Sequence, residues 1–270
     1  MELSKVGNAP ENLDGYFYHS IELPGRPAIA GAWDLRAHVD EYLGSVDLAR
    51  KRILEVGAAN GFLTFTMERR GARVVPYDLS PDHLGDIMKI PGRDYSEFEE
   101  GYRKVVAGLN KAWWYARNAF GSSLELTHGT AYDLRDVIGE VDVTLFGSIL
   151  LHLRDPYSAL KEAGRVTRER IIVTDTHNPP FTDETIPRDH ELRSGILFDP
   201  SRGKDPCTWW YLSPGSIQRM LASLGFARSE VTFHTQIFRP GFSPWGATAV
   251  DSYRGPEIVG SLFTVVADRS

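Results

Sequence analysis

A short glycine-containing segment carries the clearest chemical signal in this chain, together with an acidic residue that follows some way after it. Gly57 and Gly61 allow the backbone to turn tightly and to approach a ligand with no side chain between them. Asp78 follows at the end of a predicted strand, where a carboxylate can accept hydrogen bonds from two ribose hydroxyls. The segment therefore predicts a site for a cofactor that contains a nucleoside.

Two cofactors fit this outline, and Glu55 distinguishes between them. A dinucleotide-binding loop has the close spacing Gly-x-Gly-x-x-Gly, whereas three residues separate Gly57 from Gly61. A carboxylate at Glu55 is unfavourable beside a pyrophosphate but suits an ammonium group. A cofactor with ribose at one end and a cationic amino-acid tail at the other is S-adenosylmethionine. A nicotinamide dinucleotide, in an oxidoreductase, is the alternative.

The same residues resemble a known family. Glu55-x-Gly57-x-x-x-Gly61 followed by Asp78 resembles the first motif and second-strand acid of the class I S-adenosylmethionine-dependent methyltransferases, and residues 146–156 resemble their fourth-strand motif. The resemblance implies that Glu55 and Gly57 lie near the methionine amino group, that Asp78 binds the ribose diol, and that residues 129–131 lie beside the adenine. The cofactor-binding residues that it implies are Glu55, Gly57, Ala58, Asn60, Gly61, Asp78, Leu79, Thr130, Ala131 and Ser148.

Within that superfamily, the chain is similar to the transferases that carboxymethylate the wobble uridine of tRNA. The similarity lies in Leu-x-His-x-x-x-Pro at residues 150–156 and in an aromatic run before a Ser-Pro helix start. Those enzymes have a tyrosine and an arginine for a carboxylated cofactor where this sequence has Leu151 and Cys207. We therefore expect ordinary S-adenosylmethionine and a small-molecule acceptor, with a tRNA-modifying transferase as an alternative.

Three residues that follow predicted strands are candidates for catalysis. His152 can remove a proton from a hydroxyl or ammonium group as the methyl arrives, and His177 could serve in the same way. Asp175 could orient the acceptor or hold a histidine in one tautomer. Each of the histidines could instead have a structural role. The spacing of these three residues and Asp183 fits no compact metal motif, so no metal is expected.

Aromatic residues in two long connections are candidates for the acceptor pocket. Trp113 and Trp114 lie in a predicted helix, and Trp209 and Tyr211 lie in the second connection. They could form an apolar wall for a flat acceptor, or they could pack in the core. The predicted reaction is an in-line methyl transfer to oxygen or nitrogen, which depends on positioning the acceptor about 3 Å from the methyl. Alternatives are alkyl transfer or cyclisation of the cofactor's amino-acid arm, and cofactor binding without turnover.

The elements that must position these residues alternate between strands and helices, which predicts an α/β fold. The resemblance implies a Rossmann-like, doubly wound, mostly parallel sheet of seven strands in the order 3-2-1-4-5-7-6, with strand 7 antiparallel. We expect residues 1–50 to form an N-terminal arm and helix on a catalytic domain at 51–270, with insertions at 79–123 and 176–212 forming a lid. The predicted strands are 52–56, 73–77, 124–128, 141–146, 170–174, 231–238 and 262–267, and the predicted helices are 33–48, 62–70, 96–120, 154–166 and 213–224.

The composition of the 270-residue chain narrows the function classes. The chain carries 30 Lys and Arg against 36 Asp and Glu, a net charge of −6, which does not favour nucleic acid as a partner. One cysteine excludes an intramolecular disulfide, and no apolar run is long enough to span a bilayer. The first residues lack the apolar core of a signal peptide. We therefore expect a cytoplasmic monomer or homodimer that acts on a small molecule.

Overall fold

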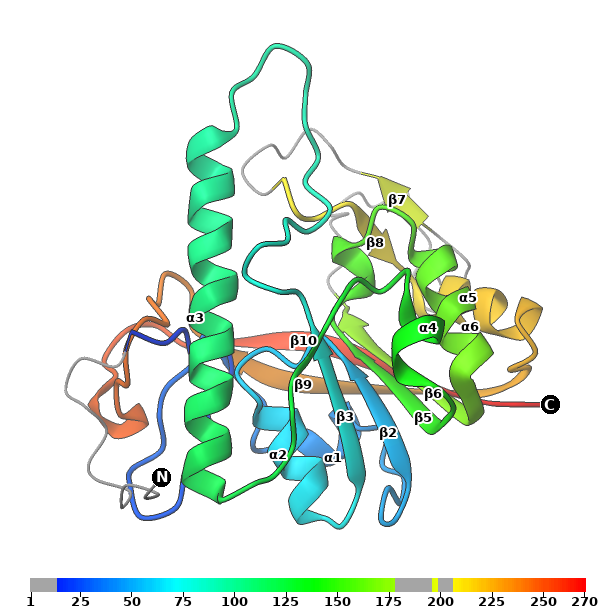
Figure 1. Ribbon diagram of the computed structural model, residues 1–270, viewed down its shortest axis with the longest axis horizontal. Helices are drawn as coiled ribbons and strands as arrows, with labels where there is room; N and C mark the ends of the chain where they lie inside the picture. The colour runs from blue at the N-terminus through cyan, green and yellow to red at the C-terminus, as the bar shows by residue number, and fades with distance from the viewer. Residues whose placement is uncertain (1–13, 178–195, 199–205) are drawn as a thin grey trace.

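An eight-stranded mixed sheet forms the centre of the computed structural model, which describes residues 14–177, 196–198 and 206–270 (Figure 1). In spatial order its strands are β1 (Trp33–Asp34), β9 (Arg228–Phe238), β10 (Ile258–Asp268), β6 (Thr167–Thr176), β5 (Val141–Gly147), β2 (Arg52–Val56), β3 (Arg73–Asp78) and β4 (Thr127–His128). A separate antiparallel pair consists of β7 (Ile196–Phe198) and β8 (Trp210–Leu212).

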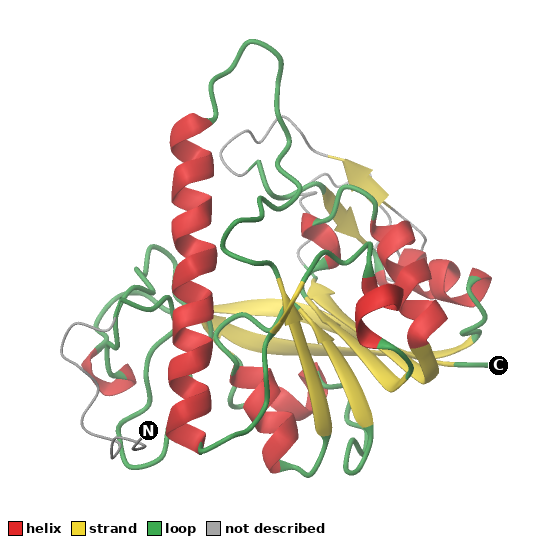
Figure 2. Ribbon diagram, in the orientation of Figure 1, coloured by secondary structure: helices red, strands yellow, loops and turns green. Residues whose placement is uncertain are grey.

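Helices occupy both faces of this sheet (Figure 2). They are α1 (Val39–Tyr42), α2 (Phe62–Arg69), α3 (Ser96–Phe120), α4 (Leu134–Ile138), α5 (Pro156–Val166) and α6 (Pro214–Ser223), with the short 3-10 helices η1 (Leu150–His152) and η4 (Val250–Ser252). Within the described part of the chain, no helix is long and apolar enough to cross a membrane.

The sheet is parallel over β4, β3, β2, β5 and β6 and antiparallel towards β1. Strand β10 runs antiparallel to β6 and to β9, and β1 runs antiparallel to β9. The predicted pairing of the last two strands is confirmed, with Val265 opposite Val231. The predicted seven-stranded order differs in detail, because the N-terminal arm adds β1 as an eighth strand at the edge.

Alternating side chains divide the core into two layers. Ile53 and Leu145 point towards α2 and α3, whereas Leu54 and Phe146 point towards α4, α5 and α6. Figure 1 shows α3 standing on one side of the sheet and α4, α5 and α6 on the other. This doubly wound arrangement brings the carboxyl ends of β2, β3, β5 and β6 to one edge, which is where open parallel sheets bind ligands.

Most predicted elements are confirmed to within a few residues, and helix α3 is confirmed at both ends. The predicted helix over residues 33–48 is wrong. Only Val39–Tyr42 is helical, because Gly44 and Ser45 have φ of 77° and 52° and end it, while residues 33–34 join the sheet. The predicted strand over residues 124–128 is shorter than expected, with only Thr127–His128 paired to β3.

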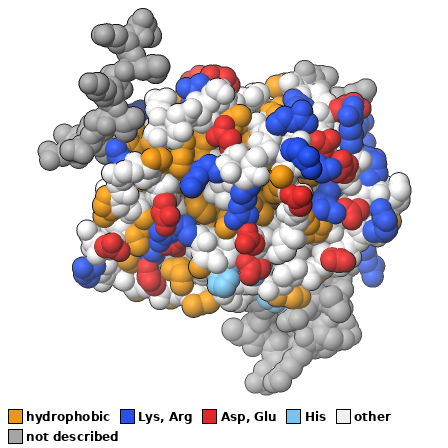
Figure 3. All heavy atoms as spheres, turned by 90° about the horizontal axis from the view of Figure 1, so that it is seen from below, with side chains coloured by type: hydrophobic (Ala, Val, Ile, Leu, Met, Phe, Trp, Pro, Cys, Tyr) orange, Lys and Arg blue, Asp and Glu red, His pale blue; other side chains and the backbone are white. Residues whose placement is uncertain are grey.

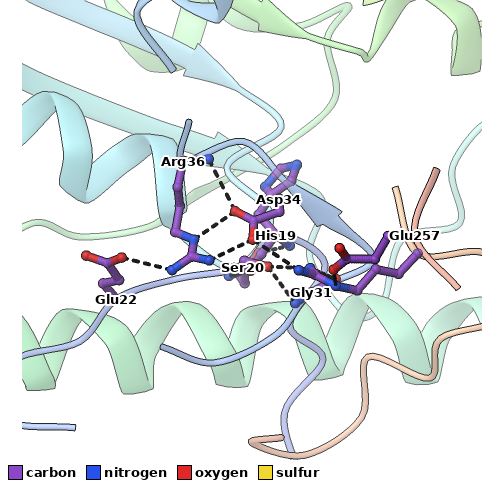
Figure 4. A network of polar contacts seen from close by, with 9 residues as sticks. His19, Ser20, Glu22, Gly31, Asp34, Arg36 and Glu257 are labelled. Atoms are coloured by element: carbon purple, nitrogen blue, oxygen red, sulfur yellow. Dashed lines mark hydrogen bonds and ion pairs between the residues drawn. The ribbon is translucent and has the colours of Figure 1, made fainter. Parts of the chain in front are cut away.

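A buried ion cluster fastens the arm, whose described part is residues 14–32, to the end of β9 (Figure 4). The side chain of Arg239 is 2% exposed and donates hydrogen bonds to Ser20 Oγ at 2.9 Å and to the Gly31 carbonyl at 3.0 Å. It also pairs with Asp34 at 3.1 Å and with Glu257 at 2.8 Å. These five residues, called the Arg239 cluster below, hold the arm against the sheet.

Candidate functional site

The glycine loop turns between β2 and α2 as the sequence predicts. Gly57 and Gly61 have φ of +87° and +85°, a region that favours glycine. A side chain at Gly57 would meet Ile149 Cδ1 at 2.3 Å, and one at Gly61 would meet Phe65 at 2.4 Å. The space beside these glycines is thus filled by the protein's own side chains. Close packing and a left-handed backbone both favour glycine at these two positions.

Asp78 closes β3 and fixes the loop from the side. Its Oδ2 accepts a hydrogen bond from the Ala59 backbone N–H at 2.7 Å, and its Oδ1 accepts one from the Leu79 N–H at 2.7 Å. Burial raises the pKa of this carboxyl, while the two backbone hydrogen bonds oppose the rise. Each carboxylate oxygen has two lone pairs, so Asp78 retains acceptor capacity for the hydroxyls of a ribose.

Glu55 is the most unusual acid at this edge. It is 1% exposed, its Oε2 accepts a hydrogen bond from Thr64 Oγ1 at 2.5 Å, and its buried Oε1 has no partner among the described residues. Burial raises its pKa to about 8, although the Thr64 hydrogen bond acts in the opposite direction. A buried oxygen without a partner is costly unless a ligand completes it. Glu55 therefore has an open place for a hydrogen-bond donor.

Trp113 lies behind Glu55 rather than at an open wall. Its side chain is 0% exposed, and its indole N–H donates to Thr64 Oγ1 at 3.3 Å. The ring packs against Phe65 with centroids 5.3 Å apart. The structure therefore places Trp113 in the core, where it supports the Thr64 hydroxyl that bonds Glu55. Its predicted contact with an acceptor does not agree with this burial.

Asn60 connects the loop to the N-terminal arm, a link that the sequence analysis missed. Its Oδ1 accepts from the His19 N–H at 2.8 Å, and its Nδ2 donates to the His19 carbonyl at 3.0 Å. The side chain is fully buried, so this amide is committed to the arm, and the predicted cofactor contact of Asn60 stays a prediction for its backbone. The Gly-Tyr-Phe-Tyr-His run of the arm, residues 15–19, gave no signal from spacing alone.

The segments after β4 and β5 complete the edge. The Thr130 carbonyl accepts a hydrogen bond from Tyr77 Oη at 3.1 Å, its hydroxyl donates to Asp133 at 2.6 Å, and Ala131 is buried. After β5, Ser148 has a φ of +54° and its hydroxyl lies 3.3 Å from Tyr42 Oη. The glycine loop follows β2, Thr130 follows β4 and Ser148 follows β5, and these strands are parallel. The predicted residues therefore lie at the same edge of the sheet.

His152 lies in η1, directly beyond β5. Its Nδ1 is 2.9 Å from the carbonyl oxygen of Cys207. Because a carbonyl can only accept, Nδ1 carries the proton and the neutral ring presents Nε2 as an acceptor. This tautomer is the one that a general base requires. A second hydrogen bond lies beside this one, from the Trp209 backbone N–H to the Leu151 carbonyl at 2.8 Å. The two positions compared above with the tRNA-modifying enzymes, Leu151 and Cys207, are therefore close to each other in the structure.

Asp175 lies near the end of β6, and His177 follows the last residue of that strand. Asp175 Oδ1 accepts from the Thr176 N–H at 2.7 Å, while its buried Oδ2 has no hydrogen-bond partner. Burial raises the pKa of Asp175 to about 7. The His177 ring packs against Phe233 and Phe263, at 4.9 Å and 6.3 Å between centroids. Asp183 lies outside the described residues, and among those described no group of three His, Cys, Asp or Glu could hold a metal.

The predicted acceptor aromatics are spread over two places. Trp114 packs in α3 with the Arg117 guanidinium 5.1 Å from its ring, and Trp209 Nε1 donates to the Asp86 carbonyl at 2.7 Å. Asp86 also accepts from the Arg154 N–H at 2.8 Å and from the Tyr132 hydroxyl. The first insertion is thereby fastened across the edge to Trp209. Tyr211 lies half-buried in β8, and residues 178–195 and 199–205 of the second insertion lie outside the described residues.

A hollow at the opposite edge of the sheet is distinct from this site. Figure 3 views the molecule from below Figure 1 and shows acidic and basic side chains interspersed over that surface. The hollow measures about 620 Å³ and is lined by Glu140, Lys161, Gly164, Arg165, Thr167, Arg168, Leu224 and Arg269. Thr167 and Arg168 begin β6, whereas the predicted site residues follow strand ends.

Comparisons with known proteins agree with this architecture. At the level of sequence, no protein-family model and no curated protein matches the chain. Among solved structures, the N-terminal domain of EvdMO1, determined in the presence of S-adenosylhomocysteine (SAH) and D-fucose, is 20% identical with a TM-score of 0.56, covering 96% of this chain and 93% of that one. The chain has the fold of the class I methyltransferases.

Two further structures support this assignment of the fold. A Bacillus halodurans protein provisionally described as a methyltransferase is 13% identical with a TM-score of 0.54, covering 86% of this chain and 98% of that one. The Bacillus subtilis YcgJ protein is 14% identical with a TM-score of 0.53, covering 84% and 95%. At such identities the similarity establishes the fold, and function must be argued from the site.

Proposed function

We propose that this protein is an S-adenosylmethionine-dependent methyltransferase that modifies an oxygen or nitrogen of a small organic acceptor. The observation that carries the proposal is the buried, unpartnered Oε1 of Glu55, at the end of β2 and next to a glycine loop. An ammonium group would supply the donor that this oxygen lacks. The acidic group at this place disfavours a pyrophosphate, and so disfavours the nicotinamide alternative.

The residues present fit the two ends of that cofactor. Glu55 would hold the ammonium of the amino-acid arm, and Asp78 would accept hydrogen bonds from the ribose diol while its backbone hydrogen bonds keep it in place. Thr130 and Ala131 would lie beside the adenine, as the family resemblance implies. When bound, S-adenosylmethionine supplies an electrophilic methyl group. The chain's contribution is to position the acceptor and to exclude water.

His152 is the proposed base where the acceptor must lose a proton. Its Nδ1–H is held by the Cys207 carbonyl, so Nε2 can accept the proton of a hydroxyl or ammonium group. Asp175, with its unpartnered Oδ2, is a second acceptor at the same edge. A small acceptor is supported by the EvdMO1 domain, whose structure was determined in the presence of a sugar, and by the net charge of −6.

Calorimetric titration tests the cofactor assignment. We expect S-adenosylhomocysteine to bind the wild-type protein and NADH not to bind. Asp78→Ala should abolish the binding, whereas Asp94→Ala, which changes an exposed acid that bonds Ser96, should leave it intact. NADH binding, or an unchanged affinity in Asp78→Ala, would contradict the proposal.

Turnover with a panel of small acceptors tests the reaction. The nucleoside product distinguishes the alternatives, because methyl transfer yields adenosylhomocysteine whereas use of the amino-acid arm yields methylthioadenosine. His152→Asn keeps a donor for the Cys207 carbonyl but lacks Nε2. We expect it to lower kcat by about 10²–10⁴-fold with cofactor affinity unchanged. Wild-type turnover in this variant would remove the role of His152.

A further inference from the structure

The backbone of His19 is fixed against the cofactor loop from two sides. The Asn60 amide bonds both its N–H and its carbonyl, at 2.8 Å and 3.0 Å. On the other side Gly31 packs so closely that an added Cβ would lie 2.3 Å from the His19 carbonyl carbon. The neighbouring Ser20 belongs to the Arg239 cluster. The direction in which the His19 side chain leaves the arm is therefore set by the fold.

The His19 ring is buried and its Nδ1 lacks a partner. The residue is 7% exposed, and the ring lies 4.9 Å from Tyr18 and 6.3 Å from Phe62, the first residue of α2. Figure 4 shows the ring turned away from the Arg239 cluster. Burial lowers its pKa to about 4, so the imidazole is neutral at pH 7. A neutral ring can donate one hydrogen bond, and this one donates none within the described structure.

The surroundings connect this ring to Glu55. Thr64, two residues after Phe62, bonds Glu55 Oε2. The His19 ring and the Glu55 carboxyl therefore both lie beside the first turn of α2, and each has one buried polar atom without a partner among the described residues.

The loop itself has few donors left for an anion. The N–H groups of Gly57 and Ala58 donate to the Tyr77 carbonyl at 2.8 Å and 3.3 Å, and the Ala59 N–H donates to Asp78. An amino acid carries its carboxylate on the same carbon as its ammonium. A ligand whose ammonium meets Glu55 therefore brings a carboxylate to this neighbourhood, where it needs a donor other than those N–H groups.

We propose that His19 binds the carboxylate of the cofactor's amino-acid end through its Nδ1–H, while Glu55 holds the ammonium on the same carbon. This inference rests on the proposed function and deepens it. The positive end of the α2 dipole favours the same charge. The N-terminal arm is then part of the cofactor site, and Asn60 acts through the arm as a positioning residue.

A calorimetric comparison of two ligands tests the proposal, because S-adenosylmethionine and its decarboxylated form differ only in the carboxylate. We expect His19→Phe, which keeps a packed ring but has no nitrogen, to weaken S-adenosylmethionine binding by about 10- to 100-fold, as for a lost hydrogen bond to a charged group. Binding of the decarboxylated form should change by less than about threefold. His19→Asn places an amide nitrogen close to the position of Nδ1 and should restore most of the affinity.

Controls separate this proposal from a change in folding. His38→Ala alters an exposed histidine and should match the wild type with both ligands. Urea unfolding of each variant shows whether the arm is intact. If His19→Phe weakens both ligands equally, or weakens neither, the carboxylate contact is wrong. If the wild-type protein binds neither ligand, the proposed function itself fails. If His19→Phe does not fold, the wild type and His19→Asn are compared for the two ligands instead. If both bind S-adenosylmethionine less than about threefold more tightly than its decarboxylated form, the proposed contact is wrong.

Discussion

The Arg239 cluster and the end of β2 each contain a buried acid, Asp34 and Glu55, and the surroundings of the two acids shift their pKa values in opposite directions. In the Arg239 cluster, Asp34 is bonded by Arg239 and by Arg36, whose Nε lies 2.7 Å away. Burial alone would raise the pKa of Asp34, but the Arg36 and Arg239 contacts lower it. At the sheet edge Glu55 has only the Thr64 hydroxyl, and burial raises its pKa to about 8.

The difference separates a structural ion pair from a ligand site. A buried carboxylate with paired guanidinium groups is complete and fastens one segment to another. A buried carboxyl with an oxygen that has no partner among the described residues destabilises the protein unless a further hydrogen-bond donor completes it. Ser20 and His19 are consecutive along the arm, and one belongs to the complete region while the other flanks the open one.

The largest expected effect on stability comes from removing the Arg239 side chain from the Arg239 cluster. Arg239→Ala leaves Asp34 with Arg36 alone and removes four hydrogen bonds to the arm and to Glu257. We expect a loss of about 3 kcal/mol in the free energy of unfolding, as for removal of one partner from a buried pair. Urea unfolding measures this, with Arg219→Ala, on the exposed side of α6, as the control. A loss no larger than the control's would show that the cluster does not hold the arm.

Removing the link between the two regions should have the next largest effect. Asn60→Ala leaves the His19 N–H and carbonyl without their partner. We expect a loss of roughly 2–3 kcal/mol on unfolding, together with weaker binding of S-adenosylhomocysteine. Asn118→Ala, on the exposed side of α3, is the matched control. If stability falls but binding is unchanged, the arm does not contribute to the site.

Glu55→Gln should sharpen the contrast, because affinity and stability are expected to move in opposite directions. The affinity for S-adenosylmethionine should fall about 10- to 100-fold, since the ammonium loses a charged acceptor. At pH 9 the variant should unfold at higher urea than the wild type, because it carries no buried charge there. Asp34→Asn should be destabilising under the same conditions. Glu100→Gln on α3 is the control. A Glu55→Gln variant that binds normally would make Glu55 merely structural.

The smallest expected effect is a difference in how Glu55 and Asp34 make the stability of the protein depend on pH. Glu55 has a raised pKa of about 8, so its contribution to stability is present below the usual value of 4.5 and is lost as the pH rises through 8. Asp34 has a lowered pKa, so its contribution is present above its usual value of 3.8 and is lost as the pH falls through the lower one. The wild type should therefore lose stability as the pH rises from about 5 to 8, and Glu55→Gln should lose less.

Ligand binding reports on the same proton. An ammonium group beside Glu55 favours the ionised carboxyl, so binding at pH 7 should release about 0.9 proton from a group with a pKa near 8. Calorimetry in phosphate and in Tris, which differ in ionisation enthalpy, measures the release. Equal heats in the two buffers would mean that Glu55 is already ionised or does not meet the ligand.

The sequence predicted the fold class and the glycine turn between β2 and α2 because both depend on local patterns. Glu55, the glycine loop and Asp78 lie within one strand–helix–strand unit, where strand period, glycine conformation and strand ends decide the geometry. The place of Trp113 stayed open between core and acceptor pocket, and the helix predicted over residues 33–48 was wrong, for the opposite reason. Whether an aromatic residue on a helix is buried depends on which elements pack against it. A segment with helical spacing of apolar residues can also pair with a neighbouring strand, as residues 33–34 pair with β9.

The sequence by itself therefore determined most of the strands and helices, the turn at Gly57–Gly61 and the acids at the ends of two strands. Only the tertiary structure decided which polar atoms are satisfied and which are left open. Asn60 and His19 are 41 residues apart, and Arg239 bonds Ser20 across 219 residues. Contacts of that length follow from how the arm packs on the sheet, and no spacing along the chain encodes them.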